Sequence, residues 1–446
     1  MKKVITYGSF DLMHYGHIRL LERAKKLGDY LIVGVTSDDY DKTRGKINLQ
    51  QSLTERVEAV KATGLADQIV IEEYEGQKID DIKKFRVDIF TVGSDWRGKF
   101  DYLNKYCDVV YLERTKGVSS SQIRSEEGKI RLGIVGDVER AMLQKIINEC
   151  AIVNGIDISG IYTTRERKDA QDVQETGLEF FREYDGLLEE SDAVYILSQP
   201  SKHYEHIKKA IGMGKHVLVE LPMVLEMSQC DELFKYADEN KVILMPALKT
   251  AYSTAYNRLV LIIQSGKIGK VLSVDATCTS IRDFDMTSDE SWCGMYAWGP
   301  TTLLPIFQIL GTDYVKADIY SSFLDNDKKF DSFSKIHFLY EGSLASAKVG
   351  AGVKSEGELI VSGTKGYVYV PAPWWKTEYF ELRYEKIENN RKYFYQLDGE
   401  GIRYELVEFV KSIKFGKNSY FISNNLIKNI SAISERFDKG DITELI

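Results

Sequence analysis

The chain is poor in proline, in cysteine and in long apolar runs, and each shortage excludes a class of protein. It has only 7 prolines but 27 Tyr and 19 Phe, which excludes a largely disordered chain, because disordered segments are short of aromatic residues. The 5 cysteines are scattered without a CxxC pair, so neither a disulfide framework nor a zinc site is expected. No apolar run approaches the roughly 18 residues of a membrane-spanning helix, and no long apolar signal segment follows Met1. We expect a cytoplasmic protein with reduced thiols and no membrane insertion.

The chain also lacks an excess of positive charge. Lys plus Arg number 59 and Asp plus Glu number 67, which gives a net charge of −8. Sequence-independent binding of nucleic acid needs a basic surface, so no nucleic-acid partner is expected. The 446 residues exceed one compact core and, at roughly 150 residues per domain, predict about three domains.

Strand and helix patterns alternate over residues 1–128. Apolar runs typical of strands occupy residues 4–7, 30–36, 68–72, 88–92 and 109–112. An amphipathic stretch at 18–27 predicts a helix, ended by Gly28 in a left-handed conformation. Such alternation predicts an α/β fold with a parallel sheet covered by helices on both faces.

The same alternation starts again at residue 129 and continues to about residue 250. From residue 271 onward, strand patterns follow one another without helices between them, and two helices are expected near 404–413 and 424–437. Strands in succession favour a mostly antiparallel sheet. We therefore expect three domains: 1–128, 129–250, and an α+β domain with a large open sheet at 251–446.

The segment after the first strand carries two histidines, His14 and His17, at the start of the first helix. A strand that leads into a helix N-terminus collects backbone N–H groups, which favour phosphate. Histidines there can donate hydrogen bonds to phosphoryl oxygens as charge develops. Taken alone, the two residues are also plausible as surface histidines in a turn.

Basic and hydroxyl residues elsewhere in the first domain strengthen the phosphate hypothesis. Arg44 and Lys46 share a glycine-containing loop, and a run from Arg114 to Gln122 holds three serines before a predicted helix. Ser119 and Gln122 have the spacing of a helix-capping box, which is the purely structural explanation. A second helix N-terminus that holds a triphosphate is the functional explanation.

Together, the runs TYGSFDLMHYGHIRLLERAKKLGDYL, GSDWRGKFD and RTKGVSSSQI closely resemble the glycerol-3-phosphate cytidylyltransferases, within the HxGH nucleotidyltransferase superfamily. The resemblance covers residues 1–128 and implies a Rossmann-like domain. It also implies a Mg²⁺-dependent reaction of CTP with a polyol phosphate, glycerol 3-phosphate first, that gives a CDP-polyol and pyrophosphate. Such a product would supply activated polyol for a cell-surface polymer, in cell-wall or capsule biosynthesis.

The resemblance also assigns the site residues. The catalytic residues would be His14, His17, Lys46 and Arg114. Residues that would bind the nucleotide are Tyr7, Gly8, Ser9, Phe10, Asp11, Gly16, Arg44, Arg56, Gly93, Asp95, Trp96, Arg114, Thr115, Gly117, Ser119, Ser120 and Ser121. Lys46, Lys78 and Asp95 would bind the acceptor. No metal site made by the protein itself is expected. Ser9 stands where threonine is usual and Arg44 where lysine is common.

Residues 129–446 resemble the Gfo/Idh/MocA oxidoreductase family, through the segments SQPSKH, AIGMGKHVLVE, SGKIGKV and GTKG. That family has a Rossmann domain for NAD(P) followed by a sheet domain, and it commonly oligomerises. Both resemblances imply a homo-oligomer.

The positions that would carry redox chemistry depart from the family pattern. Val138 replaces the second glycine of the dinucleotide turn, and Asp137 and Glu139 add negative charge there. Leu221 stands where the family has a catalytic lysine. Ala297 and Thr301 stand where it has an aspartate and a histidine. We therefore expect a degenerate, redox-inactive region without a working NAD(P) site.

Two alternatives remain open. In the first, the protein is bifunctional, and an NAD(P)-dependent region makes the polyol phosphate that the first domain then cytidylylates. In the second, both regions serve only as scaffolds, which the intact HxGH and RTxG segments oppose.

Overall fold

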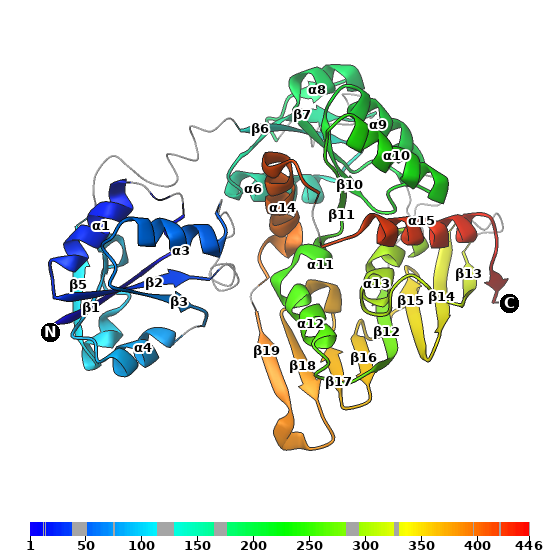
Figure 1. Cartoon of the computed structure of the whole chain (residues 1–446). Helices are drawn as coiled ribbons and strands as arrows, with labels where there is room; N and C mark the ends of the chain where they lie inside the picture. Colours follow the sequence, from blue (N-terminus) through cyan, green and yellow to red (C-terminus); the bar gives the residue numbers. More distant parts are fainter. Residues whose placement is uncertain are drawn as a thin grey trace. The chain divides into compact units, whose positions relative to one another are not determined.

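The computed structural model describes residues 1–11, 13, 15–37, 51–74, 76–113, 129–164, 176–281, 294–324, 330–395, 397–418 and 421–445. The chain forms two compact units, Met1–Lys129 and Ile130–Ile446 (Figure 1). No helix of the described residues is long and apolar enough to cross a membrane.

The first unit is built on a five-stranded sheet in the order β3-β2-β1-β4-β5, in which every pair is parallel. Its strands are β1 (Lys3–Gly8), β2 (Tyr30–Thr36), β3 (Gln68–Glu72), β4 (Ile89–Gly93) and β5 (Asp108–Leu112). Its helices are α1 (Tyr15–Lys25), α3 (Leu53–Ala62) and α4 (Gln77–Phe85), with 3₁₀ turns η1 (Ser94–Trp96) and η2 (Asp101–Lys105).

Both faces of this sheet are buried, because successive strand residues point to opposite sides. Val4 packs with Leu21 of α1 and Val60 of α3 on one face. Its neighbour Ile5 packs with Ile82 of α4 on the other. Figure 1 shows α1 and α3 on one side of the sheet and α4 on the opposite side.

One local prediction in this unit is wrong. Helix α1 ends at Lys25, and Gly28 does not take the left-handed conformation expected of a helix-ending glycine. A Cβ at Gly28 would lie 2.6 Å from the carbonyl oxygen of Lys2. Glycine is needed here because the chain passes close to the start of β1, which the local sequence pattern does not reveal.

The strand order changes direction between β1 and β4, and open α/β sheets bind ligands at such a point, beyond the carboxyl ends of the strands. The segment that starts at Ser9 leaves β1 at this edge, and η1 leaves β4 there. This edge is therefore where the candidate site is sought.

The second unit begins with a six-stranded parallel sheet in the order β11-β10-β9-β6-β7-β8. Its strands are β6 (Ile130–Val135), β7 (Ile156–Tyr162), β8 (Phe180–Phe181), β9 (Ala193–Ile196), β10 (His216–Glu220) and β11 (Leu244–Ala247). Its helices are α6 (Arg140–Ile152), α8 (Tyr184–Glu190), α9 (Pro200–Gly212) and α10 (Met227–Glu239).

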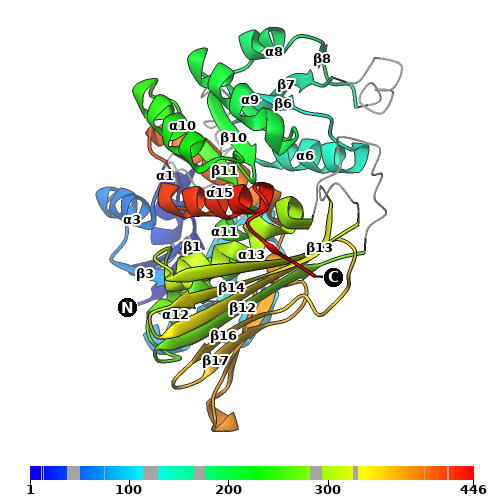
Figure 2. The ribbon, with the colours of Figure 1, turned by 90° about the vertical axis from the view of Figure 1, so that its right-hand side faces the viewer.

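A nine-stranded sheet completes this unit, in the order β19-β18-β17-β16-β12-β15-β14-β13-β20. Its strands are β12 (Val271–Thr279), β13 (Lys316–Phe323), β14 (Asp331–Tyr340), β15 (Ser343–Gly350), β16 (Leu359–Gly363), β17 (Tyr367–Val370), β18 (Tyr379–Arg383), β19 (Arg391–Phe394) and β20 (Thr443–Glu444). Pairing is antiparallel except between β12 and β15 and between β13 and β20. Figure 2 shows α13 (Gly294–Leu310) and α15 (Asn424–Asp438) on one face of this sheet.

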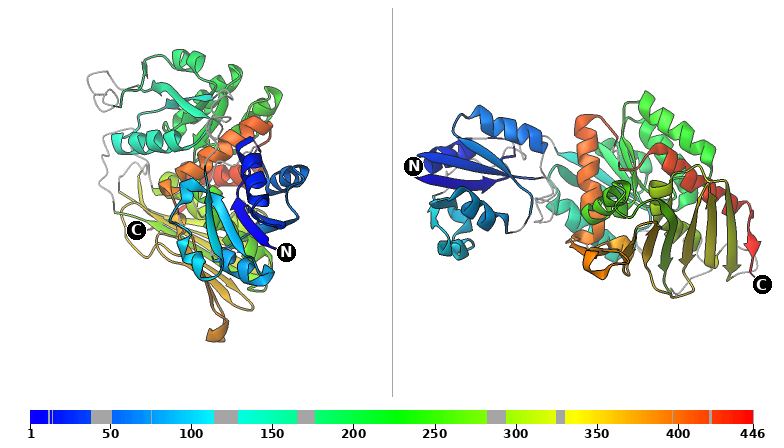
Figure 3. Two further views of the ribbon diagram at one scale, coloured as in Figure 1. Left: turned by 90° about the vertical axis from the view of Figure 1, so that its left-hand side faces the viewer. Right: turned by 60° about the horizontal axis from the view of Figure 1, so that its bottom comes forward.

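Helices α11 (Lys249–Tyr252) and α12 (Thr254–Gln264) connect the two sheets of this unit. The remaining helical elements are η3 (Trp374–Lys376), η4 (Ile387–Asn389), η5 (Gly399–Gly401) and α14 (Ile402–Phe415). Helix α14, orange-red in Figure 3, packs on α6 and α11, and Arg403 Nε lies 2.7 Å from Glu149 Oε2. The predicted fold class, α/β with two Rossmann-like regions and a large, mostly antiparallel sheet, is confirmed.

Candidate functional site

The segment after β1 in the first unit is held tightly against the sheet. Phe10 is buried and has a positive φ of 52°, a conformation that non-glycine residues adopt rarely. Its ring meets the ring of His17, in the first turn of α1, edge to face at 5.5 Å. Asp11 is also buried, and its Oδ1 accepts a hydrogen bond of 3.0 Å from the backbone N–H of Gln51. The position of His17 is therefore fixed by packing.

Arg56 of α3 is fully buried beside this segment. Its Nη1 donates to the carbonyl oxygens of Ser9, at 2.6 Å, and Thr36, at 2.9 Å, and its Nε donates to the carbonyl oxygen of Gln51, at 3.2 Å. These bonds join the end of β1, the end of β2 and the entry to α3. In this arrangement Arg56 positions the backbone of the site.

A pocket, here called the Lys78 pocket, opens at the same edge of the sheet. Its lining residues are Tyr7, Gly8, Thr36, Glu72, Lys78, Val92, Trp96 and Phe100. Lys78 forms an ion pair with Glu72, and both side chains are buried, with 8 % and 1 % exposed. Glu72 Oε2 also accepts a hydrogen bond of 3.2 Å from the hydroxyl of Thr36. The ammonium and the carboxylate therefore largely offset each other inside the pocket.

Aromatic rings surround the ammonium of Lys78. Lys78 Nζ lies 4.7 Å from the ring centroid of Tyr7 and 5.6 Å from that of Phe100. The Tyr7 hydroxyl donates a hydrogen bond of 2.8 Å to Asp81 Oδ2. Burial, followed by the negative charge of Asp81, raises the pKa of Tyr7 far above its usual range. Tyr7 therefore stays a neutral hydrogen-bond donor at every working pH.

The structure brings together part of the site predicted from the sequence. It places Tyr7, Gly8, Lys78 and Trp96 in one pocket, and Ser9, Phe10, Asp11, Gly16, His17 and Arg56 around the segment after β1. Gly93 ends β4, and Asp95 lies in η1. Other predicted residues lie outside the described part of the chain: His14, Arg44, Lys46, Arg114, Thr115, Gly117, Ser119, Ser120 and Ser121. The roles of all these residues stay predictions.

Sequence reasoning missed Glu72, Asp81 and Phe100. Glu72 had a detectable signal, because a charged residue that closes an apolar strand of a parallel sheet lies at the ligand-binding edge. Asp81 and Phe100 carried no comparable local signal. Phe100, in the loop after η1, lines the pocket, and Asp81 of α4 lies behind it as the hydrogen-bond acceptor of Tyr7.

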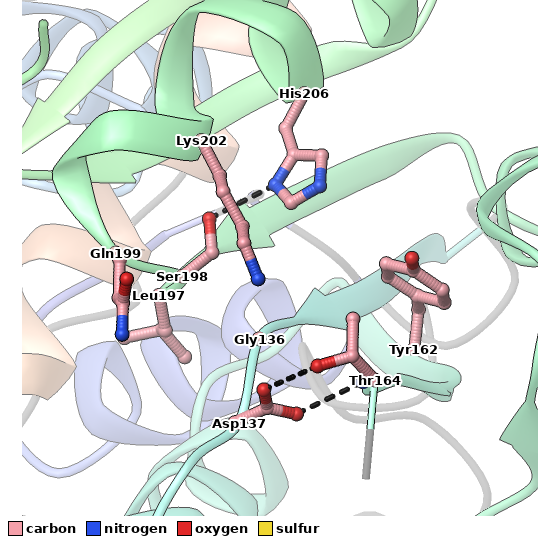
Figure 4. Close-up of a pocket in the computed structure, with 9 residues that line it drawn as sticks. All are labelled: Gly136, Asp137, Tyr162, Thr164, Leu197, Ser198, Gln199, Lys202 and His206. Carbon is pink, nitrogen blue, oxygen red and sulfur yellow. Dashed lines mark hydrogen bonds between the residues drawn. The ribbon is translucent and has the colours of Figure 1, made fainter. Parts of the chain in front are cut away.

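In the second unit, a pocket lies at the carboxyl ends of β6, β7 and β9 (Figure 4). It is lined by Gly136, Asp137, Tyr162, Thr164, Leu197, Ser198, Gln199, Lys202 and His206. The strand order reverses here, between β6 and β9, where Rossmann folds bind dinucleotides. Gly136 has a φ of 134°, and a Cβ there would lie 2.6 Å from the backbone nitrogen of Ser198. The first glycine of the turn is thus required by close packing.

The next two residues of the turn differ from a dinucleotide site. Val138 is buried, with 7 % of its surface exposed. The carboxylate of Asp137 accepts hydrogen bonds from the Thr163 hydroxyl, the Thr164 backbone N–H at 2.9 Å and the Thr164 hydroxyl at 2.6 Å. Donors at the end of β7 are therefore engaged by a negatively charged group of the protein itself (Figure 4).

The opposite wall of this pocket carries His206 and Lys202, both from α9. His206 Nδ1 lies 2.9 Å from the Ser198 hydroxyl. Burial, with the nearby His203 and Lys202, lowers the pKa of His206 to about 4. His206 is therefore neutral near pH 7, and Lys202 carries the positive charge on this wall.

A second polar cluster lies beyond β9, β10 and β11. Tyr195 directs its hydroxyl at Glu405 Oε1, at 2.8 Å, and Glu220 Oε1, at 3.0 Å. Lys249 Nζ lies 3.3 Å from Glu220 Oε1. Burial acts to lower the pKa of Lys249, but the carboxylates of Glu220 and Glu405 raise it on balance. Leu221, which follows Glu220, is buried, and Ala297 and Thr301 lie one turn apart in α13.

The comparisons with known proteins match the two units separately. The family model described as Cytidylyltransferase-like matches residues 5–126, and the model described as Oxidoreductase family, NAD-binding Rossmann fold (Gfo/Idh/MocA) matches residues 130–248. Glycerol-3-phosphate cytidylyltransferase of Bacillus spizizenii is 49% identical over 126 residues, which is 28% of this chain and 97% of that protein. Its counterpart in Staphylococcus aureus is 44% identical over 126 residues, 28% of this chain and 95% of that protein. Ethanolamine-phosphate cytidylyltransferase of Dictyostelium discoideum is 33% identical over 129 residues, 27% of this chain and 35% of that protein.

Solved structures match the second unit. KijD10, a 3-ketoreductase from Actinomadura kijaniata in complex with NADP and TDP-benzene, has a TM-score of 0.62 at 18% identity, over 71% of this chain and 99% of that one. UDP-N-acetylglucosamine 3-dehydrogenase from Acidithiobacillus ferrooxidans has a TM-score of 0.57 at 17% identity, over 69% of this chain and 96% of that one. At this identity the likeness establishes the fold of the second unit. The chain belongs to the glycerol-3-phosphate cytidylyltransferase family through its first unit, which is followed by a unit of the Gfo/Idh/MocA oxidoreductase fold.

Proposed function

We propose that the first unit is a CTP:polyol-phosphate cytidylyltransferase, with glycerol 3-phosphate as the first acceptor to test. The observation that carries this proposal is the 49% identity over 126 residues with a glycerol-3-phosphate cytidylyltransferase, which spans 97% of that protein. The geometry supports it, because the buried segment after β1 and the Lys78 pocket lie at the ligand-binding edge of the sheet. We expect the reaction in the cytoplasm, where CTP is made, with its product used for a cell-surface polymer.

The reaction needs positioning and neutralisation of charge more than it needs a base. A phosphate oxygen of the acceptor attacks the α-phosphorus of CTP, a new P–O bond forms, and the bond to pyrophosphate breaks. Because that oxygen is already an anion, no proton has to be removed from it first. We assign the stabilisation of the transition state to His14, His17, Lys46 and Arg114.

Mg²⁺ would enter with CTP as part of the substrate. The oxygens of the triphosphate are the ligands we propose for it, and the ion would neutralise charge on the phosphates. The other predicted nucleotide-binding residues are proposed to orient the same complex.

The test is the release of pyrophosphate by the full-length chain from CTP and Mg²⁺, with glycerol, erythritol and ribitol phosphates as acceptors. We expect release with at least one acceptor and a CDP-polyol of matching mass. A chain that gives no product with any member of the panel would refute the proposal. ATP in place of CTP is the matched nucleotide control.

We further propose that the second unit is redox-inactive. Three features support this: the buried Val138 at the dinucleotide turn, the Asp137 carboxylate at the end of β7, and a leucine, Leu221, in place of the family lysine. A branched side chain at the second turn position prevents the close approach of backbone to pyrophosphate. Ala297 and Thr301 also cannot supply the carboxylate and the imidazole of the family pattern.

Titration of the full-length chain with NADH and NADPH, followed by nicotinamide fluorescence, tests this proposal. We expect no saturable binding of either cofactor and no oxidation of NAD(P)H with keto-sugars. Saturable binding would show that the dinucleotide turn does hold a cofactor, and oxidation of NAD(P)H would refute redox inactivity.

One observation favours the bifunctional alternative. Lys249, at the carboxyl end of β11, brings an ammonium group to within 3.3 Å of Glu220 Oε1, beside the position that Leu221 occupies. A lysine that follows β11, one strand away from the family's lysine position after β10, could still donate a proton to a carbonyl group of a substrate. In this alternative the second unit binds NADPH and reduces a keto-sugar phosphate, and Lys249→Met removes that activity while leaving binding of NADPH in place.

The division into regions 1–128, 129–250 and 251–446 and the homo-oligomer are further proposals. Light scattering on the full-length chain measures the oligomer, and cytidylyltransferase activity of an isolated 1–128 fragment tests the first boundary.

A further inference from the structure

The Lys78 pocket has the composition of a site for an organic cation, and the protein fills it with its own ammonium group. Aromatic faces next to a carboxylate are the recurring protein site for alkylammonium ligands. Here the rings of Tyr7 and Phe100 lie 4.7 and 5.6 Å from Lys78 Nζ, and Glu72 forms the ion pair. We call Tyr7, Glu72 and Phe100 the cation cage.

We propose that Lys78 occupies the cation cage and thereby excludes acceptors that carry an ammonium group, so that the pocket takes only uncharged, hydroxyl-bearing ends of acceptor phosphates. This inference rests on the proposed function of the first unit. It assigns Lys78 a role in selecting between two classes of acceptor, polyol phosphates and aminoalcohol phosphates.

The ammonium of Lys78 is held firmly in the cage. Its side chain is only 8 % exposed, and it belongs to the first turn of α4. The neighbouring residue Gln77 anchors that turn, because its Nε2 donates to the carbonyl oxygen of Ile71, at 2.6 Å, and to Asp81 Oδ2, at 3.1 Å. Lys78 therefore cannot swing out to admit another cation without breaking a buried ion pair, which is strongly unfavourable.

The remaining surface of the pocket suits hydroxyl groups. The Thr36 hydroxyl and the Glu72 carboxylate are polar, while Val92 and Trp96 offer apolar surface for the carbon chain. An uncharged polyol end can share hydrogen bonds with these groups. An ammonium end would find the Glu72 carboxylate already paired with Lys78. The positive charge of Lys78, at about 5 Å in a partly buried site, should make an ammonium end bind more weakly, by a factor on the order of 100, than it would beside an unpaired Glu72.

The test compares glycerol 3-phosphate with phosphoethanolamine as acceptors, for the wild type and for Lys78→Ala, Lys78→Met and Lys84→Ala. Lys84 lies in the same helix with an exposed side chain outside the pocket, so its variant is the matched control. The measured quantity is the ratio of kcat/KM for the two acceptors, with CDP-ethanolamine identified by its mass.

We expect the wild type and Lys84→Ala to use glycerol 3-phosphate and to reject phosphoethanolamine. In Lys78→Ala the ratio should shift toward phosphoethanolamine by about 100-fold. Adding Glu72→Gln to Lys78→Ala should cancel most of this gain, because the carboxylate of the cage is then gone. A wild type that uses phosphoethanolamine as well as glycerol 3-phosphate would overturn the inference.

A second measurement does not depend on turnover. Methylammonium chloride should raise the Tm of Lys78→Ala, relative to the same concentration of sodium chloride, and should leave the Tm of the wild type unchanged. Lys78→Met keeps the cage filled but removes the charge, so it serves for the acceptor ratio alone if the alanine variant does not fold. The inference is wrong if a folded Lys78→Ala shows neither the shift in acceptor ratio nor the rise in Tm, or if only Lys78→Met folds and its acceptor ratio equals that of the wild type.

The two proposals fail in different ways. A wild type without activity on any polyol phosphate refutes the proposed function, whatever methylammonium does. A wild type active on glycerol 3-phosphate, with unchanged selectivity in Lys78→Ala, refutes only the role of the cation cage.

Discussion

Replacing Arg56 by methionine is the sharpest test of how the first unit holds its site together. The guanidinium is fully buried and donates to three backbone carbonyls, those of Ser9, Thr36 and Gln51. Methionine fills much of the volume but leaves the three acceptors without their charged donor. The prediction therefore isolates the hydrogen bonds from the loss of packing.

The expected loss of stability is large. A hydrogen bond to a charged group contributes about 1.5–3 kcal/mol. The loss of all three bonds could therefore lower the free energy of unfolding by nearly the whole stability of a domain. The bond to the carbonyl of Gln51, just before the start of α3, is 3.2 Å long and only partly buried. Water can therefore replace part of this bond. We therefore expect Arg56→Met to lower the free energy of unfolding by about 3–5 kcal/mol, the range measured when a buried charged contact is broken.

Calorimetry on the full-length chain measures this effect as a fall in the Tm of the first unit. For a unit of this size the fall should be roughly 10–20 °C. Lys61→Met, in the same helix with an exposed side chain, is the control and should change the unfolding free energy by less than about 0.5 kcal/mol. The reasoning is wrong if the unfolding free energy of Arg56→Met lies within about 1 kcal/mol of the wild-type value while its KM for CTP is raised. Arg56 would then bind phosphate and would not act as a positioning residue.

Three further predictions use other parts of the chain. His17→Ala should lower the kcat for pyrophosphate release by about 10²-fold, the usual loss for one charge-stabilising donor, and an unchanged kcat would remove His17 from the mechanism. Gly28→Ala should destabilise the first unit by about 1–3 kcal/mol, measured by urea unfolding, because its Cβ would lie 2.6 Å from the Lys2 carbonyl. Burial raises the pKa of Glu405 to about 8, above its unfolded value, so its contribution to stability is full at low pH and is lost as the pH rises toward 8. Glu405→Gln should remove that dependence, and the two unfolding free energies should diverge between pH 5 and 8 by at most about 1.4 kcal/mol per pH unit. Parallel pH profiles would contradict this.

Much of the fold follows from the sequence, because the patterns that define it are local. Apolar runs bounded by glycine or polar residues predicted the strands of the first unit to within a few residues, as for β2 and β3. The switch from alternating strands and helices to strands alone predicted the large sheet. The residues that carry the family resemblance, such as those around His17, are also contiguous in the chain.

The sequence by itself therefore determined the fold class and the family, and it predicted the edge of the sheet at which we propose that phosphate chemistry takes place. Tertiary structure alone decided which long side chains meet: Glu72 with Lys78, Arg56 with three separate carbonyls, and Lys249 of α11 with Glu220 at the end of β10. It also decided that Gly28 is required by a close approach to β1 and not by a left-handed turn. The physical reason is that the spacing of apolar residues within a short stretch of chain is enough to predict a strand or a helix. The direction of a flexible charged side chain depends instead on the register of elements far apart in the chain and on which partner removes it from water at the lowest cost.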